Sequence, residues 1–251
     1  MLRSIDRLIG YVLQAHDGEI GRCKDFLFDD ERWGIRYMVA DTGKWLPGRR
    51  VLVSPISLGH PEWDEERLPV ALTKEQIESA PGIPVDAPVS GQHEAEYFAF
   101  MGYLPYWGGV NPWGPYMTPT RLRAAAEGAG EGVATSIEHR KDSHLRSAHE
   151  VTGYHIRASD GDVGHVEDFI VDDDNWIIRY MVVDTRNWLP GRKVIIAPEW
   201  VRGFDWAERT ATVDLTKDQI ENSPDYTPDA PLSRSYEERL YDYYERPTYW
   251  P

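Results

Sequence analysis

The chain contains the same sequence unit twice. Residues 10–81 align with residues 153–224 without a gap, at a constant offset of 143 positions. From Tyr37 the chain reads YMVADTGKWLPGRRVLVSP, and from Tyr180 it reads YMVVDTRNWLPGRKVIIAP. A match over a whole domain length indicates one folding unit used twice, so residues kept in both copies can be separated from residues that drifted.

The repeat extends beyond this stretch. The tripeptide Leu-Arg-Ser that begins at Leu2 returns at Leu145, and Tyr106-Trp107 returns as Tyr249-Trp250. Each copy is on the order of 100 residues, which is enough to bury a core without disulfide bonds or structural metal ions. We therefore expect five segments: a first repeat over 1–90, an aromatic arm over 91–117, a linker over 118–144, a second repeat over 145–233 and a second arm over 234–251.

Charge and composition limit the classes of partner. The formal net charge of −15 opposes binding to phosphate backbones, so we expect no nucleic-acid partner. No apolar run approaches the roughly 18 residues of a membrane-spanning helix, and the first residues lack the pattern of a signal peptide. These features predict a cytoplasmic protein without an integral membrane segment. The single cysteine, Cys23, corresponds to Val166, which indicates a buried apolar residue.

Within each repeat, turn signals separate short apolar runs. Asp17-Gly18 divides two such runs, Asp160-Gly161 does so in the second repeat, and this dipeptide favours a hairpin. Thr73 and Gln76 have the spacing of a capping box at a helix start, and the second repeat has the same spacing. The pattern predicts a mainly β fold of two tandem small antiparallel barrels, each with a short C-terminal helix and an aromatic arm.

A family resemblance lies in the same residues. From Asp17 the chain reads DGEIGRCKDFLFDDERWGIRYMVADTG, followed by LPGRRVLVSP and ALTKEQIESAP. This order, present twice, resembles the PRC-barrel domain over about 10–88 and 153–231. That domain occurs in the cytoplasmic part of the photosynthetic reaction-centre H subunit and in a ribosome maturation factor. The chain is similar to stand-alone bacterial tandem proteins of this family. The resemblance implies a binding or assembly module, with no catalytic residues and no cofactor.

One turn is a candidate ligand site in both repeats. It combines an acid, an indole and a guanidinium within nine residues, which could frame a pocket that binds an anion and stacks a ring. Alternatively, Pro-Gly makes the turn, the acid pairs with the arginine across it, and the indole covers the barrel mouth. We favour the second interpretation. The residues are Asp41, Trp45 and Arg49 in the first repeat and Asp184, Trp188 and Arg192 in the second.

Two acidic turns and the histidines are candidate metal sites. The turns at 29–31 and 172–174 carry consecutive carboxylates, but a calcium loop spreads its ligands over about twelve residues. Solvated hairpin ends are the expected structure. No histidine occupies the same position in both repeats, which excludes a duplicated histidine site. We expect no metal site.

The third apolar run has apolar residues on both of its faces. Ile35, Tyr37 and Val39 alternate with Met38 in the first repeat, and Met181 is the counterpart of Met38 in the second. A strand of this kind is covered on both sides, whereas a small barrel has only one interior. We expect the barrels to pair through Met38 and Met181, within the chain or as a homodimer.

The arms are too rich in aromatic residues for a disordered linker. We expect each arm to pack on a barrel, across copies, although an arm that binds a partner remains an alternative. The expected docking residues are Tyr97, Phe98, Tyr106 and Trp107 in the first arm, and Tyr241, Tyr244, Tyr249 and Trp250 in the second.

These features predict a non-enzymatic scaffold or adaptor that binds a protein. No duplicated nucleophile, carboxylate pair or phosphate-cradling glycine loop supports catalysis. One alternative is a small-molecule or anion sensor, or an enzyme, that uses the Asp-Trp-Arg turn. A second alternative, by family analogy, is a peripheral component of a photosynthetic or membrane electron-transport complex.

Overall fold

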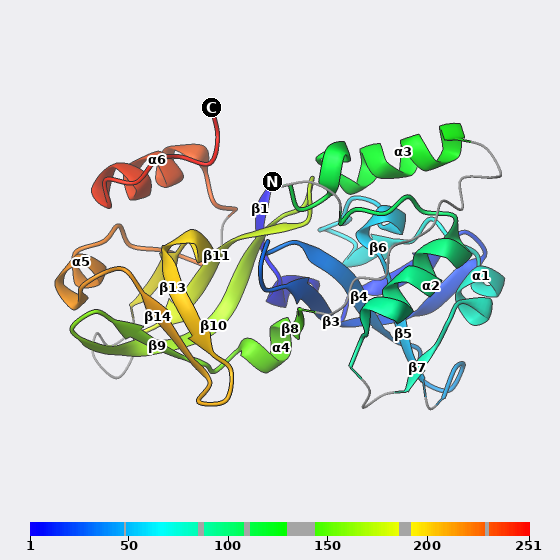
Figure 1. Cartoon of the computed structure of the whole chain (residues 1–251), viewed down its shortest axis with the longest axis horizontal. Coiled ribbons are helices and arrows are strands. Elements are labelled where there is room, and N and C mark those ends of the chain that lie inside the picture. The colour runs from blue at the N-terminus through cyan, green and yellow to red at the C-terminus, as the bar shows by residue number, and fades with distance from the viewer. Residues whose placement is uncertain (48, 85–87, 108–110, 130–143, 186–191, 229–230) are drawn as a thin grey trace. The chain divides into compact units, whose positions relative to one another are not determined.

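The computed structural model describes all residues except 48, 85–87, 108–110, 130–143, 186–191 and 229–230 (Figure 1). The chain divides into two compact units. The first-repeat unit contains residues 7–147 together with 173–177, and the second-repeat unit contains residues 1–6, 148–172 and 178–251. Each unit is mainly β and holds a seven-stranded sheet. Each unit also includes a short segment that belongs to the other repeat in sequence.

The sheet of the first-repeat unit has the order β6-β2-β3-β4-β5-β7, and β8 pairs with β3. Its strands are β2 (Val12–Ala15), β3 (Gly18–Asp29), β4 (Ile35–Asp41), β5 (Arg49–Val53), β6 (Arg67–Pro69), β7 (Ile83–Pro84) and β8 (Leu145–Ser147). Its helices are α1 (Lys74–Ser79), α2 (Gly91–Met101) and α3 (Pro119–Ala129), with the short 3₁₀ turns η1 (Asp6–Leu8), η2 (Pro55–Ser57) and η3 (Gly114–Tyr116).

The sheet of the second-repeat unit has the order β12-β11-β10-β9-β14-β13, and β1 pairs with β10. Its strands are β1 (Leu2–Ser4), β9 (His155–Ala158), β10 (Gly161–Asp172), β11 (Ile177–Asp184), β12 (Lys193–Ile196), β13 (Val201–Asp205) and β14 (Thr210–Val213). Its helices are α4 (Ala148–Val151), α5 (Lys217–Glu221) and α6 (Arg234–Tyr243), with the 3₁₀ turn η4 (Pro198–Trp200).

Several local predictions are confirmed. The β2–β3 and β9–β10 hairpins form at the predicted turns, where Ala15 pairs with Gly18 and Ala158 with Gly161. Both capping boxes are present: the hydroxyl of Thr73 accepts from the Gln76 amide, and the Gln76 side chain accepts in return. These contacts satisfy donors that the first helical turn leaves free.

The sheets are mixed, which differs from the purely antiparallel prediction. β6 pairs parallel to β2, and β14 pairs parallel to β9. The chain between the paired strands, which contains β3 to β5 in the first repeat and β10 to β13 in the second, provides the long connection that parallel pairing requires. Among the described strands, no pairing joins the two ends of either sheet. The chain therefore has two mixed sheets where the sequence predicted closed barrels.

Two short strands are exchanged between the repeats. β1 precedes the first repeat in sequence but pairs antiparallel with β10, whereas β8 precedes the second repeat and pairs antiparallel with β3. Leu2 lies opposite Asp172, and its counterpart Leu145 lies opposite Asp29 in the same register. The repeat pattern predicted two continuous domains, and this exchange was missed because the pattern does not say which sheet a strand joins.

Part of the predicted linker is helical. Helix α3 occupies 119–129, packs against η2, and buries Leu122 completely. The remainder of that segment, 130–143, lies outside the described residues.

Two glycines at equivalent positions are required by close backbone approach. A Cβ at Gly164 would overlap the carbonyl oxygen of Asp184, and one at Gly21 would overlap that of Asp41. We predict that Gly164→Ala lowers the free energy of unfolding by about 1–3 kcal/mol, because the strand must shift to relieve the overlap. Urea denaturation measures this loss.

The matched control is Gly203→Ala in the same sheet, where a Cβ would meet no atom within 4 Å. Its expected effect is within about 0.5 kcal/mol. Equal losses in the two variants would show that the close approach at Gly164 is not a constraint.

Candidate functional site

The arginines of the Asp-Trp-Arg turn bind helix ends. Arg49 donates from Nη2 to the carbonyl of Ile77 at 2.7 Å and from Nη1 to that of Glu78 at 2.8 Å. Arg192 likewise donates to the carbonyls of Glu221 and Ser223 at the end of α5. A helix leaves its last carbonyls without partners, so these arginines stabilise the short terminal helix of each repeat.

The predicted pairing of the acid with the arginine is wrong in the first repeat. Asp41 is exposed and accepts a hydrogen bond from the Gly43 amide at 2.9 Å, while Arg49 binds α1 instead. Trp45 is half-buried, and in the described residues no hydrogen bond or ion pair joins it to Asp41 or Arg49. The structure therefore does not bring this candidate set together.

The second repeat differs at its acid. Asp184 is buried, and its carboxylate lies 3.9 Å from Nε2 of His165. Arg192 forms an ion pair with Asp225 at 2.8 Å. Trp188 lies outside the described residues, so the second candidate set is only partly described.

We predict that Arg49→Ala lowers the free energy of unfolding by about 1–3 kcal/mol, since the carbonyls at the end of α1 lose their charged donor. The control is Lys44→Ala in the same turn, an exposed residue whose expected effect is within about 0.5 kcal/mol. A double-mutant cycle between Asp41 and Arg49 should give a coupling near zero. A clear coupling energy would show that Asp41 and Arg49 do pair across the turn.

Asp29 of the first acidic turn is a buried anchor, which corrects the prediction of a solvated hairpin end, whereas Asp30 is half-buried and Glu31 is exposed. Asp29 is fully buried, pairs with Nη2 of Arg36 at 3.1 Å, and accepts the Glu31 amide at 3.0 Å. Arg36 also donates to the carbonyl of Pro112 at 2.5 Å. Buried charges persist only when they are paired and hydrogen-bonded in this way.

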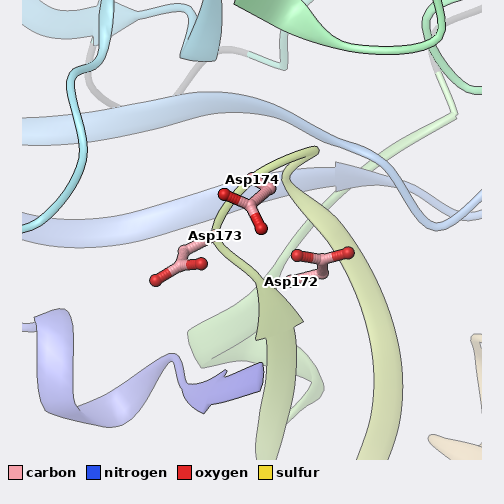
Figure 2. A group of neighbouring side chains, drawn as sticks. All are labelled: Asp172, Asp173 and Asp174. Carbon is pink, nitrogen blue, oxygen red and sulfur yellow. The ribbon is translucent and has the colours of Figure 1, made fainter. Parts of the chain in front are cut away.

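The second acidic turn gathers three consecutive carboxylates at the end of β10 (Figure 2). Oxygen atoms of Asp172, Asp173 and Asp174 lie within 4.8 Å of one another, with Asp173 buried and Asp174 exposed. Calcium takes about six to eight oxygen ligands, and one short turn supplies only part of such a shell. We assign no metal to this cluster.

Both methionines of the third strand are fully buried. Met38 lies opposite Phe26 on β3 and Val53 on β5, and Phe26 stacks on Trp176 within the first-repeat unit. The packing of the two barrels through Met38 and Met181 stays a prediction, because these contacts lie within one unit.

The predicted docking residues of the arms contact the sheet of their own repeat and one another. In the first arm, Tyr97 packs edge-on against Tyr37 of β4, with ring centroids 5.4 Å apart. In the second arm, Tyr241 packs against Trp200 at the same separation of 5.4 Å. The buried members are Tyr97, Phe98, Tyr106, Tyr241 and Tyr244, and the half-buried members are Trp107, Tyr249 and Trp250.

The expected docking across copies is found at one described contact of the first arm. The indole of Trp113 donates to the carbonyl of Asn175 at 2.5 Å, and Asn175 belongs to the second repeat in sequence. The ring contacts of the eight docking residues run within their own repeat. Local docking is favoured because α2 and α6 follow the strands of their own repeat in sequence.

A buried carboxylate anchors each arm. Glu94 and its counterpart Glu237 are each 1% exposed. Tyr106 donates to Glu94 at 2.7 Å, and Tyr249 donates to Glu237 at 2.7 Å. In the second repeat, Tyr180 of β11 also donates to Glu237 at 2.7 Å. The bonds from Tyr106 and Tyr249 lie within the arms, whereas the bond from Tyr180 joins the second arm to β11.

An arginine of the third strand completes each anchor. The guanidinium of Arg36 lies 3.9 Å from the ring centroid of Tyr106, and that of Arg179 lies 4.1 Å from Tyr249. We call these two sets the arm anchors: Arg36, Tyr37, Glu94 and Tyr106, and their counterparts Arg179, Tyr180, Glu237 and Tyr249. Burial raises the pKa of Tyr180 and Tyr249 well above the usual value, so both phenols stay protonated donors.

Sequence reasoning missed the charged members of the arm anchors. A signal was available, since each arginine recurs at the same position of an otherwise apolar strand and each glutamate recurs at the same position of its arm. A charged residue kept in both repeats among apolar neighbours indicates a buried, partnered group.

We predict that Tyr249→Phe lowers the free energy of unfolding by about 1–3 kcal/mol, because the buried carboxylate of Glu237 loses a donor while the ring stays over Arg179. The control is Tyr243→Phe, which removes a hydroxyl from a ring that is 38% exposed. It should cost less than about 1 kcal/mol. Thermal denaturation compares the two, and equal effects would contradict an anchoring role for Tyr249.

The exchanged strands are fixed by a serine–aspartate pair. The hydroxyl of Ser4 donates to Asp168 at 2.5 Å, and that of Ser147 donates to Asp25 at 2.5 Å. Burial raises the pKa of Asp168 from 3.8 to about 6, although the hydrogen bonds from Ser4 and from two backbone amides oppose the shift. In the second-repeat unit the ionised carboxylate is thus a cost to stability near neutral pH.

The folded state binds the Asp168 proton more tightly than the unfolded state, so this group adds stability as the pH falls from about 7 to about 4. We predict that the stability of the wild type relative to Asp168→Asn rises by about 2 kcal/mol over that range. Denaturation at several pH values measures the difference. A difference that stays constant with pH would refute a raised pKa at Asp168.

No protein-family model matches the chain, and no curated protein matches it. The PRC-barrel resemblance therefore rests on the motifs quoted above. In the described residues, no helix combines the length and apolar character needed to cross a bilayer.

Proposed function

We propose that the protein is a non-enzymatic scaffold or adaptor, built from two PRC-barrel-like repeats, that binds another protein. The observation that carries this proposal is that the polar residues shared by both repeats make structural contacts within the fold. Arg49 and Arg192 bind helix ends. Glu94 and Glu237 accept tyrosine hydroxyls within their arms, and Glu237 also accepts that of Tyr180 on β11. Groups that are engaged in structural contacts are unsuited to turn over a substrate, so the duplicated polar chemistry favours assembly over catalysis.

The arms offer the partner-binding surface. Phe100 on α2 is 46% exposed, and Tyr243 at the equivalent position of α6 is 38% exposed. Their neighbours Phe98 and Tyr241 are buried against the fold. Aromatic side chains contribute strongly to protein interfaces, and this pair is presented at the same place in both repeats. The proposal assigns the arm a buried face that holds it and an exposed aromatic residue that contacts the partner.

The sensor or enzyme alternative receives less support. It needs a free guanidinium in the Asp-Trp-Arg turn, and Arg49 donates to carbonyls of α1 instead. Association with a photosynthetic or membrane complex rests on the family resemblance. The closure of each sheet into a small barrel is likewise part of the proposal.

Affinity purification of the tagged full-length chain from its own cells tests the proposal. We compare the wild type, Phe100→Ser/Tyr243→Ser, and the matched control Glu96→Gln/Glu238→Gln, which changes exposed residues of the same two helices. We expect one protein to be enriched with the wild type and the control, and to fall at least about tenfold with the aromatic double variant, the loss of about 1.4 kcal/mol or more.

Two outcomes would contradict the proposal. If the aromatic double variant recovers the partner as well as the wild type does, the exposed aromatic residues of the arms do not bind the partner. Co-purification of a stoichiometric small molecule without any protein, with binding abolished by Arg49→Ala, would favour the sensor alternative.

A further inference from the structure

Each sheet holds a strand that its own repeat does not supply. The donor strands share the sequence Leu-Arg-Ser, and their registers are equivalent at every position. Ser4 lies opposite Ile170, and Ser147 lies opposite Leu27. The two sheets thus have equivalent acceptor edges, at 27–29 of β3 and at 170–172 of β10.

The acceptor edge recognises side chains as well as backbone. In the second-repeat unit, Asp168 accepts the Ser4 hydroxyl at 2.5 Å and the Asp6 amide at 3.1 Å, while the Ile5 amide donates to the carbonyl of Phe169 at 2.8 Å. Leu2 and Ile5 are buried, at 7% and 4% exposure. Backbone pairing with anchored alternate side chains is the usual mode by which a sheet edge binds an extended peptide.

In the first-repeat unit the equivalent edge binds β8 in the same way. Asp25 accepts the Ser147 hydroxyl at 2.5 Å, and Asp30 accepts from Nε of Arg146 at 2.9 Å. β4 pairs with β3 along 22–28 on one side, so β8 lies on the other side, which it shares with β2.

We propose that the acceptor edge of β10 binds the N-terminal strand of a second copy of this chain, while β8 of that second copy fills the acceptor edge of β3. In the resulting dimer, the first repeat of one copy exchanges strands with the second repeat of the other, and every acceptor edge is filled. The strand contacts equal those of the single chain, so domain exchange of this kind has a low energetic cost. Within one chain the donor and acceptor strands are covalently connected, so exchange within one chain is favoured at low protein concentration.

Cysteine pairs in the full-length chain test the proposal. Because the Ile5 amide bonds the Phe169 carbonyl, the neighbouring pair Ser4 and Ile170 is non-hydrogen-bonded, with Cα atoms about 4.5 Å apart. That distance suits a disulfide. All variants carry Cys23→Val, the residue of the second repeat at this position. Ser4→Cys and Ile170→Cys are placed on separate chains, which are mixed, unfolded in urea and refolded together under mild oxidation.

We expect a disulfide-linked dimer when the mixture refolds at about 1 mM, and at least a tenfold lower yield at about 10 μM, where intrachain exchange dominates. The control is a mixture of Ser4→Cys with Leu27→Cys, in which Leu27 is the counterpart of Ile170. It should give only a background yield of linked dimer, because β8 occupies the edge at Leu27. A single chain with both Ser4→Cys and Ile170→Cys should form an internal disulfide at low concentration, which shows that the variants fold with the exchanged register.

Three results would overturn the proposal. If the single chain links internally but the mixture never links, exchange is confined to one chain. If the single chain does not link, the exchanged pairing itself is wrong. Equal linking of the Leu27→Cys mixture would mean that the strand does not select its register.

Discussion

The rest of the structure depends on the pairing of each sheet with a strand from the other repeat. β1 on β10 and β8 on β3 satisfy backbone groups of a strand edge that would otherwise be unpaired. The exchange also means that neither repeat has its complete sheet within its own continuous sequence. Duplication of the unit in one chain supplies a donor and an acceptor for each sheet.

Arg36 is a buried charge with several partners. Arg36 is enclosed by Asp29, the Pro112 carbonyl and the ring of Tyr106, so a single guanidinium connects the acidic turn, the third strand and the first arm. Breaking a buried pair of this kind is strongly destabilising because it leaves an uncompensated charge. The same arginine and glutamate recur in the second repeat, which explains why the arms are retained together with the sheets. An arm held in this way can present its exposed aromatic residue in a fixed orientation.

Local features could be predicted from the sequence, whereas long-range pairings could not. The hairpins at Asp17-Gly18 and Asp160-Gly161 and the capping box at Thr73 depend on a few adjacent residues, and all are confirmed. The prediction for Arg49 was wrong because its partners lie about thirty residues away, at the end of helix α1. The parallel strand pairs and the exchange of β1 were missed for a related reason. Hydrophobic periodicity identifies strands and their buried faces, but it does not specify which edge a strand joins.

The most direct test of the exchanged strands is a nuclear Overhauser measurement on the isotope-labelled full-length protein. Ser4 and Ile170 form a non-hydrogen-bonded antiparallel pair, in which the two Hα atoms approach closely. The account predicts a strong Hα–Hα cross-peak between Ser4 and Ile170 and an equivalent one between Ser147 and Leu27. A cross-peak between Ser4 and Leu27 in their place would show that each strand returns to its own repeat, and would contradict the account.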